Sequence, residues 1–185
     1  MILAALYSEL SSITASRVDR LKYANLVLND LTLLPKLLDI VFMVNDKTSC
    51  RAAWVLEFVC EKNSYAIIPY LDDFTANLKK LHLDSSIRPM AKICFFMAQK
   101  HSNNKPDTLK SKHKELIIEA CFDWMIGNQK IAAKAYAMDA LYLLGKEFSW
   151  VHPQLVEILK QDFHSQSAGY KVRAKRILKK LKNTC

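Results

Sequence analysis

Glycine is scarce in this chain, with three residues among 185, at Gly127, Gly145 and Gly169. Tight turns between strands rely on glycine, so its scarcity disfavours a β-sheet protein. Alanine, leucine, lysine and other strong helix formers are abundant instead, which favours helices. A P-loop or a GxGxxG turn needs clustered glycines, and these three positions cannot assemble either one. Nucleotide binding through such loops is excluded.

Paired cysteine motifs are also missing. The five cysteines are odd in number and widely spaced, with no CxxC among them: Cys50, Cys60, Cys94, Cys121 and Cys185. Four lie in or beside apolar helical stretches, so we interpret them as small buried hydrophobes in a reducing cytosol rather than as disulfides or metal ligands. HExxH, DxDxDG and GxSxG motifs are absent as well. We therefore expect no metal, no cofactor and no catalytic residue, and a protein that is not an enzyme.

Long apolar runs are lacking too, and none approaches the roughly 20 residues of a membrane-spanning helix. The apolar segment 1–7 has no basic region before it and reaches Glu9 too soon for a signal peptide. We expect a soluble cytoplasmic protein that does not contact membranes. With 51% hydrophobic and 24% charged residues, the composition is that of a globular protein, and the length suits one domain.

Helical periodicity recurs along the whole chain and is interrupted by short polar breaks. It predicts ten helices, near 2–12, 15–29, 32–44, 48–62, 66–81, 86–100, 109–126, 129–146, 153–163 and 168–182.

The helices repeat in pairs. A basic residue opens similar segments at Arg51, Arg88, Lys134 and Arg173, each in the second helix of a pair. The spacing is 37 residues from the first to the second and 39 from the third to the fourth. In three of the pairs a proline stands in the first turn of the first helix, where its missing N–H does no harm: Pro35, Pro69 and Pro153.

This repetition predicts an all-α fold, an α-α superhelix of about four stacked helix pairs that share a continuous core. We expect a single domain over 1–185. It would have an N-terminal helical cap at 1–30, two repeats at 31–100, a polar loop insertion at 101–108 and two repeats at 109–185.

Three segments carry a resemblance to known proteins. They are Arg51-Ala52-Ala53-Trp54-Val55-Leu56-Glu57, Ser167-Ala168-Gly169-Tyr170, and Arg173-Ala174-Lys175-Arg176-Ile177-Leu178-Lys179-Lys180-Leu181-Lys182. Together they resemble a small family of uncharacterised bacterial HEAT-like repeat proteins, over nearly the whole chain. The resemblance implies an α-α superhelix and supplies no catalytic residue.

The histidines and tryptophans give little indication of a catalytic, metal-binding or base-binding site. We interpret the five histidines as solvated or capping side chains, and we expect no metal site at His101 and His113 because few further ligands are near in sequence. Lyases of the fumarase type share a serine-rich mobile loop that this chain lacks. In HEAT-like DNA glycosylases aromatic residues line a groove. Here Trp54 and Trp124 lie on apolar helical faces, so we expect them to belong to the core. We expect Trp150 to be exposed.

Positive charge gathers in the second half. Residues 1–99 contain 11 basic and 10 acidic residues, whereas 100–185 contain 16 and 8, so that part holds +8 of the net +9. The candidate partner-binding residues are Lys110, Lys112, Lys114, Lys171, Arg173, Lys175, Arg176, Lys179 and Lys180. Such cations attract phosphate or an acidic partner, and they also suit the solubilising outer face of a terminal repeat. Both interpretations stay open.

These observations favour a non-catalytic binding scaffold that recognises a protein or peptide on a concave surface lined by the second helices. The alternative is nucleic-acid binding through the basic C-terminal half.

Overall fold

The computed structural model describes residues 1–104 and 108–183, and every regular element in these ranges is helical. The α-helices are α1 (Leu3–Ser11), α2 (Arg17–Asn29), α3 (Leu34–Val41), α4 (Lys47–Lys62), α5 (Leu71–Asn77), α6 (Asp84–Asn104), α7 (Ser111–Ile126), α8 (Ile131–Leu144), α9 (Val151–Asp162) and α10 (Ala168–Lys182). Short 3₁₀ helices flank α3 and α5: η1 (Leu31–Leu33), η2 (Ile68–Tyr70) and η3 (Leu78–Lys80). The predicted all-α class is confirmed, and each predicted helix has a counterpart.

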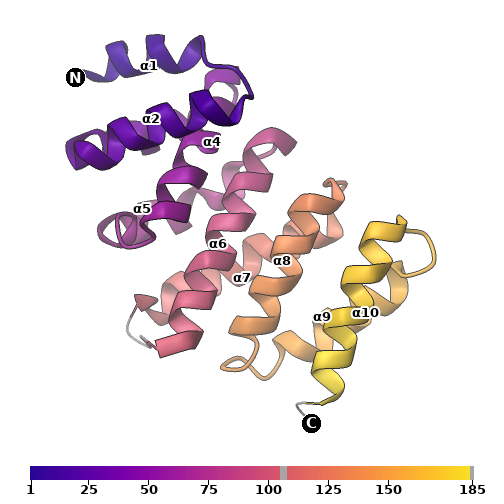
Figure 1. The fold of residues 1–185 in the computed structure, drawn as a ribbon. Coiled ribbons are helices and arrows are strands. Elements are labelled where there is room, and N and C mark those ends of the chain that lie inside the picture. The colour runs from indigo at the N-terminus through magenta and orange to yellow at the C-terminus, as the bar shows by residue number, and fades with distance from the viewer. Residues whose placement is uncertain (105–107, 184–185) are drawn as a thin grey trace. The chain divides into compact units, whose positions relative to one another are not determined.

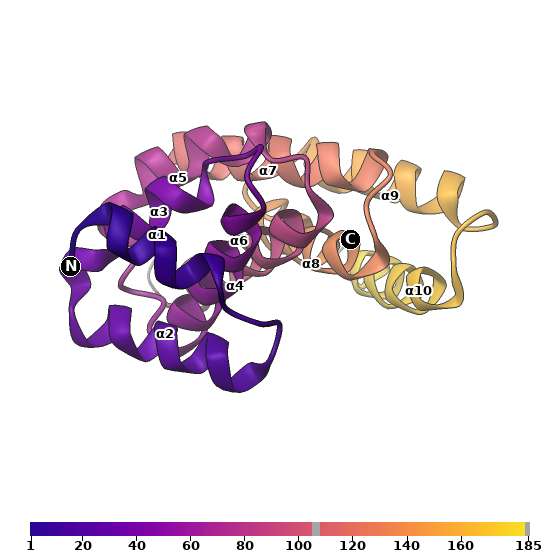
Figure 2. The same cartoon turned by 90° about the horizontal axis from the view of Figure 1, so that it is seen from above.

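The chain folds into two compact units, Met1–Ile93 and Cys94–Cys185, and the boundary between them lies inside α6. In the first unit, α1, α2 and α3 all pack against α4. In the second unit, α8 packs against α7, α9 and α10 (Figure 1). The view from above shows α7 and α9 in one layer of this unit and α8 and α10 in the other (Figure 2).

Small residues line the buried sides of the second helices. The fully buried alanines include Ala52 and Ala53 of α4, Ala137 and Ala140 of α8, and Ala174 of α10. Helix axes approach more closely where the side chains between them are small. Larger neighbours, among them Leu56, Met138 and Ile177, are also fully buried and fill the remaining space.

Pro89 lies inside α6 and has no N–H to donate to the carbonyl of Ser85, four residues earlier. The indole Nε1–H of Trp54, on α4, donates to that carbonyl oxygen at 3.0 Å. A side chain of one second helix therefore replaces the backbone hydrogen bond that proline removes from the next.

A double-mutant cycle tests this replacement. Trp54→Phe leaves the Ser85 carbonyl without its donor, whereas in a Pro89→Ala background the backbone amide of the introduced alanine can take over. We expect Trp54→Phe to lower the free energy of unfolding by about 0.5 kcal/mol more in the wild type than in Pro89→Ala. Urea unfolding of the four proteins measures the difference, and equal losses in both backgrounds would contradict the assignment.

Glu57 joins α4 to α6 by charge. Its carboxylate is 3% exposed and accepts from Arg88 Nη2 at 2.7 Å and from Lys92 Nζ at 2.9 Å. Lys92 also pairs with the more exposed Glu61 at 2.9 Å. Burial lowers the pKa of Lys92, but its bonds to Glu61 and Glu57 outweigh burial and raise that pKa overall. The buried carboxylate is thus matched by two cations from the neighbouring second helix.

Removing Glu57 should be costly because it leaves Arg88 and Lys92 facing each other without their shared anion. We expect Glu57→Ala to reduce the free energy of unfolding by about 2 kcal/mol, below the range for fully buried pairs because both cations retain some solvent. Glu61→Ala removes a carboxylate from the same lysine at an exposed position and should cost under about 1 kcal/mol. Chemical denaturation compares the two, and equal losses would contradict a special role for Glu57.

The predicted boundaries of three elements need correction. The insertion was predicted to begin at residue 101, but α6 continues through Asn104. His101, in this last part of α6, is buried and bonded to Glu147. Residues 105–107 of that insertion lie outside the described residues, as does Cys185. The helices predicted at 32–44 and 66–81 are shorter: α3 is preceded by the 3₁₀ helix η1 and ends at Val41, and α5 lies between the 3₁₀ helices η2 and η3.

None of the helices in the described ranges combines the length and apolar composition that crossing a bilayer requires.

Candidate functional site

The lysines predicted beside the insertion lie at the start of α7. Lys110 precedes the helix, and Lys112 and Lys114 are in its first turn. Lys110 and Lys112 are exposed, whereas Lys114 is half-buried and donates from Nζ to Glu147 Oε2 at 2.6 Å. Lys114 is therefore already engaged by a carboxylate of its own unit.

The basic residues predicted on the last helix lie on α10, which contains no acidic residue. Arg176 Nη2 is 2.5 Å from both carboxylate oxygens of Asp139, on α8, and Arg173 Nη1 is 3.9 Å from the nearer one. Lys175 lies over the ring of Phe163, and Lys180 lies 5.0 Å from the ring centre of Tyr142. Of the predicted residues on α10, Lys171 is half-buried and Lys179 is exposed.

Both predicted groups of basic residues, the one at the start of α7 and the one on α10, contact residues at the C-terminal end of α8. They contact different residues there. Lys180 covers Tyr142, and Lys114 binds Glu147, just beyond the helix. Lys146 also lies over the Tyr142 ring, at 5.6 Å. Because the two sets use different partners, these contacts do not join them into one surface.

A strip of aromatic and charged side chains crosses the second helices of the second unit. We call it the second-helix strip and define it as Phe95, Tyr136, Asp139, Arg173 and Arg176. The rings of Phe95, on α6, and Tyr136, on α8, lie 6.2 Å apart. Tyr136 precedes Asp139 by three residues and so shares its helix face, and Asp139 holds the two arginines of α10.

Sequence reasoning missed the aromatic members of the strip. Phe95 and Tyr136 were assigned no role, although both are partly exposed. The available signal was the position of Tyr136, two residues after the repeated basic residue Lys134, because it places an aromatic ring early in a second helix. Nothing in the sequence indicated that Phe95 would meet it.

His101, Glu147 and Lys114 form a compact charged cluster in the second unit. His101 Nε2 is 2.7 Å from Glu147 Oε1, and Lys114 binds the other carboxylate oxygen. Both His101 and His113 are buried, so neither is a solvated side chain, and the prediction of a solvated or capping histidine was wrong for His101. His113 does cap α7, since its Nδ1 accepts from the Lys110 amide at 3.4 Å. His101 Nδ1 is buried with no hydrogen-bond partner in the described ranges.

The hydrogen bond from Lys114 lowers the pKa of Glu147; burial opposes this, and the bond to His101 adds to it. A depressed pKa in the folded state means that the carboxylate stabilises the fold above its unfolded value of about 4.5 and loses that effect as the pH falls. Glu147 is partly exposed, so solvent screening keeps the contribution small.

Glu147→Gln should therefore reduce stability at neutral pH by under about 1 kcal/mol. The difference from the wild type should shrink as the pH is lowered through about 4.5, because protonation then removes the same charge from the wild type. Urea unfolding at a series of pH values measures it. A difference that is independent of pH would show that Glu147 acts through packing rather than charge.

An apolar groove lies between α9 and α10, and we call it the α9–α10 groove. Its volume is about 450 Å³. It is lined by His152, Pro153, Val156, Lys160, Leu178, Leu181 and Lys182. His152 is fixed at one end, since its Nε2 bonds the Tyr142 carbonyl at 2.9 Å and its ring stacks on the Tyr142 ring.

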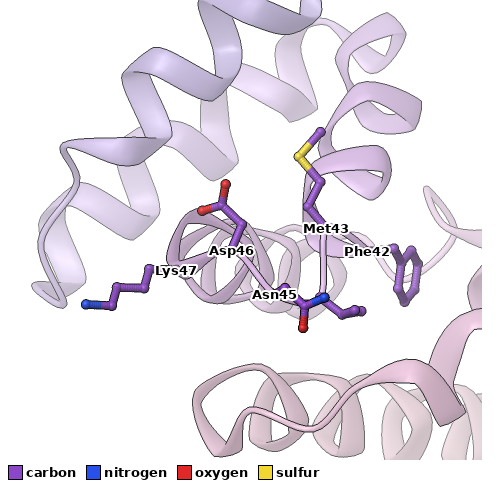
Figure 3. Close-up of a pocket in the computed structure, with 6 residues that line it drawn as sticks. Phe42, Met43, Asn45, Asp46 and Lys47 are labelled. Carbon is purple, nitrogen blue, oxygen red and sulfur yellow. The ribbon is translucent and has the colours of Figure 1, made fainter.

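The turn between α3 and α4 borders a cavity of about 700 Å³, which is larger than the α9–α10 groove but less suited to binding a ligand (Figure 3). Its polar side chains diverge: Asn45, Asp46 and Lys47 point in different directions. Asp46 caps α4 by accepting from the Thr48 amide and also accepts from the Tyr7 hydroxyl, whose bond lowers its pKa most. These groups serve the fold of the turn and do not converge on a ligand.

Other predicted positions are as follows. Cys60, Cys94 and Cys121 are buried and Cys50 is half-buried. Trp124 belongs to the core, whereas Trp150 is 48% exposed and stacks on Phe122. No group of three or more potential metal ligands comes together in residues 1–104 and 108–183.

No protein-family model, curated protein or solved structure matches this chain. The resemblance to HEAT-like repeat proteins therefore stays a prediction.

Proposed function

We propose that this protein is a non-catalytic binding scaffold of HEAT-like helix pairs, and that it recognises an acidic protein or peptide segment on the second-helix strip. The observation that carries the proposal is the combination of partly exposed aromatic rings with arginines that Asp139 holds in place. Tyrosine and arginine are enriched among the residues that dominate binding energy at protein interfaces.

A repeated contact supports the HEAT-like arrangement. Arg88 and Arg173 occupy the same position in the predicted repeat, and each meets an acidic residue of the preceding second helix within its own unit. Glu57 of α4 pairs with Arg88 at 2.7 Å, and Asp139 of α8 approaches Arg173 at 3.9 Å. The acidic partners stand at similar but not identical positions, Glu57 six residues after Arg51 and Asp139 five residues after Lys134. Recurring contacts of this kind are compatible with a tandem repeat whose second helices stack.

The strip is suited to carboxylates on flexible segments. Asp139 neutralises only part of the charge of Arg173 and Arg176, whose side chains remain almost half exposed. A guanidinium group that is already oriented loses less conformational entropy when it binds a further carboxylate. The adjacent Phe95 and Tyr136 offer apolar area for a neighbouring hydrophobic residue of the ligand.

Nucleic acid is the second candidate, favoured by the charge. Met1–Ile93 contains 11 basic and 10 acidic residues, whereas the second unit contains 16 and 8. Asp139 opposes a dianionic phosphate at Arg173 and Arg176 more strongly than it opposes a single carboxylate, and Lys175 and Lys180 lie over rings that the fold already uses. The charge therefore supports long-range attraction of polyanions more than a specific phosphate site.

Fluorescence anisotropy separates the two functions. The probes are a labelled peptide that alternates glutamate with tyrosine and leucine, a duplex oligonucleotide and a single-stranded oligonucleotide, each titrated at about 50 and about 200 mM salt. We expect the peptide to bind, and Tyr136→Ala and Arg176→Ala each to weaken its Kd about tenfold. Lys179→Ala is the matched control, since it removes an exposed cation of α10 outside the strip and should change the Kd little.

Two results would overturn the proposal. One is peptide binding that is unaffected by both strip variants. The other is steeply salt-dependent oligonucleotide binding that Asp139→Asn strengthens, because removal of that carboxylate would then release cations for phosphate. The second result would favour the nucleic-acid function.

A further inference from the structure

The α9–α10 groove offers a surface of different chemistry from the strip. Its walls are Pro153 and Val156 of α9 and Leu178 and Leu181 of α10, so apolar groups dominate it. The wall residues recur at spacings of three along each helix, which places them in a row. An apolar groove between two packed helices is a shape into which the apolar face of a third helix can pack.

The packing of the neighbouring helix pair in the same unit indicates what kind of element suits the groove. The helix pair formed by α7 and α8 is covered on one side by the next pair, because α8 packs against both α9 and α10 and α7 also meets α9. The pair formed by α9 and α10 is built alike, and the groove lies between its helices. Helical segments are therefore the kind of element that these pairs accommodate.

The charged residues around the groove favour a partner helix with acidic residues. Lys160 of α9 and Lys182 of α10 are exposed and line the groove. Neither lysine forms an ion pair within the described part of the chain. The acidic residues of α9 are Glu157 and Asp162, neither of which lines the groove, and α10 has none. A partner with acidic residues beside its apolar stripe is favoured, and one with lysines there is repelled.

We propose that the α9–α10 groove binds a single amphipathic helix of another protein, with a leucine-rich apolar stripe flanked by glutamate or aspartate. The leucines occupy the channel between Val156 and Leu178, and the acidic flanks pair with Lys160 and Lys182. This inference rests on the proposed function only in treating the protein as a binding scaffold, because the groove shares no residue with the second-helix strip.

Three synthetic helical peptides test the inference by fluorescence anisotropy. The first carries leucines at helical spacing with flanking glutamates, the second has lysines in place of the glutamates, and the third is a scrambled version of the first. We expect the first peptide to bind at least about tenfold more tightly than either of the others. Equal affinity of the acidic and basic peptides would overturn the proposal.

Leu178→Glu places a charge in the channel and should weaken binding of the acidic peptide by about tenfold or more. Val172→Glu is the matched control on the same helix, because Val172 is 67% exposed and lies outside the groove. Since Leu178 is partly buried, the exposed pair Lys160→Glu and Lys182→Glu supplies a second test that leaves the packing intact. It should weaken the acidic peptide and favour the basic one.

Further outcomes distinguish this inference from the proposed function. Binding of the helical peptide that is lost in Tyr136→Ala but kept in Leu178→Glu overturns the groove and supports the strip. Sedimentation of the unliganded protein identifies a different occupant. A dimer that Leu178→Glu converts to a monomer would show that a second copy of the chain fills the groove, and would contradict the proposal.

Discussion

The structure depends on one constraint: a helix that is apolar on more than one side must be buried against more than one neighbour. In the second unit, α8 meets α7, α9 and α10 and contributes Ala137, Met138 and Leu141 to the core without exposing them. A helix pair alone could not exclude water from both sides of such a helix. The polar contacts between successive second helices therefore act on a geometry that apolar burial has already imposed.

Within that geometry, second helices meet through contacts that compensate for local defects. Pro89 removes a backbone donor from α6, and the Trp54 indole supplies one. Burial of Glu57 would be costly for an isolated carboxylate, and Arg88 and Lys92 neutralise it. Asp139 has the same relation to Arg176 in the second unit. Such contacts tie the spacing of neighbouring helices to specific residue pairs and not only to the shape of apolar side chains.

The sequence was a good guide to the helices because their determinants are local. Ser16, Asp46 and Ser167 cap α2, α4 and α10 through bonds that span two or three residues, and the predicted positions of these helices are close to those observed. The site was harder to predict because its determinants are distant in sequence. Asp139 and Arg176 are 37 residues apart, and His101 and Glu147 are 46 apart. Composition identified α10 as basic but could not tell that Arg173 and Arg176 share an anion.

Helix geometry explains how α10 can present two separate surfaces. Leu178 follows Arg176 by two residues, which turns the side chain by about 200° on a helix of 3.6 residues per turn. Arg176 accordingly reaches Asp139 on α8, whereas Leu178 lines the groove beside α9. A ligand on one side need not displace a ligand on the other.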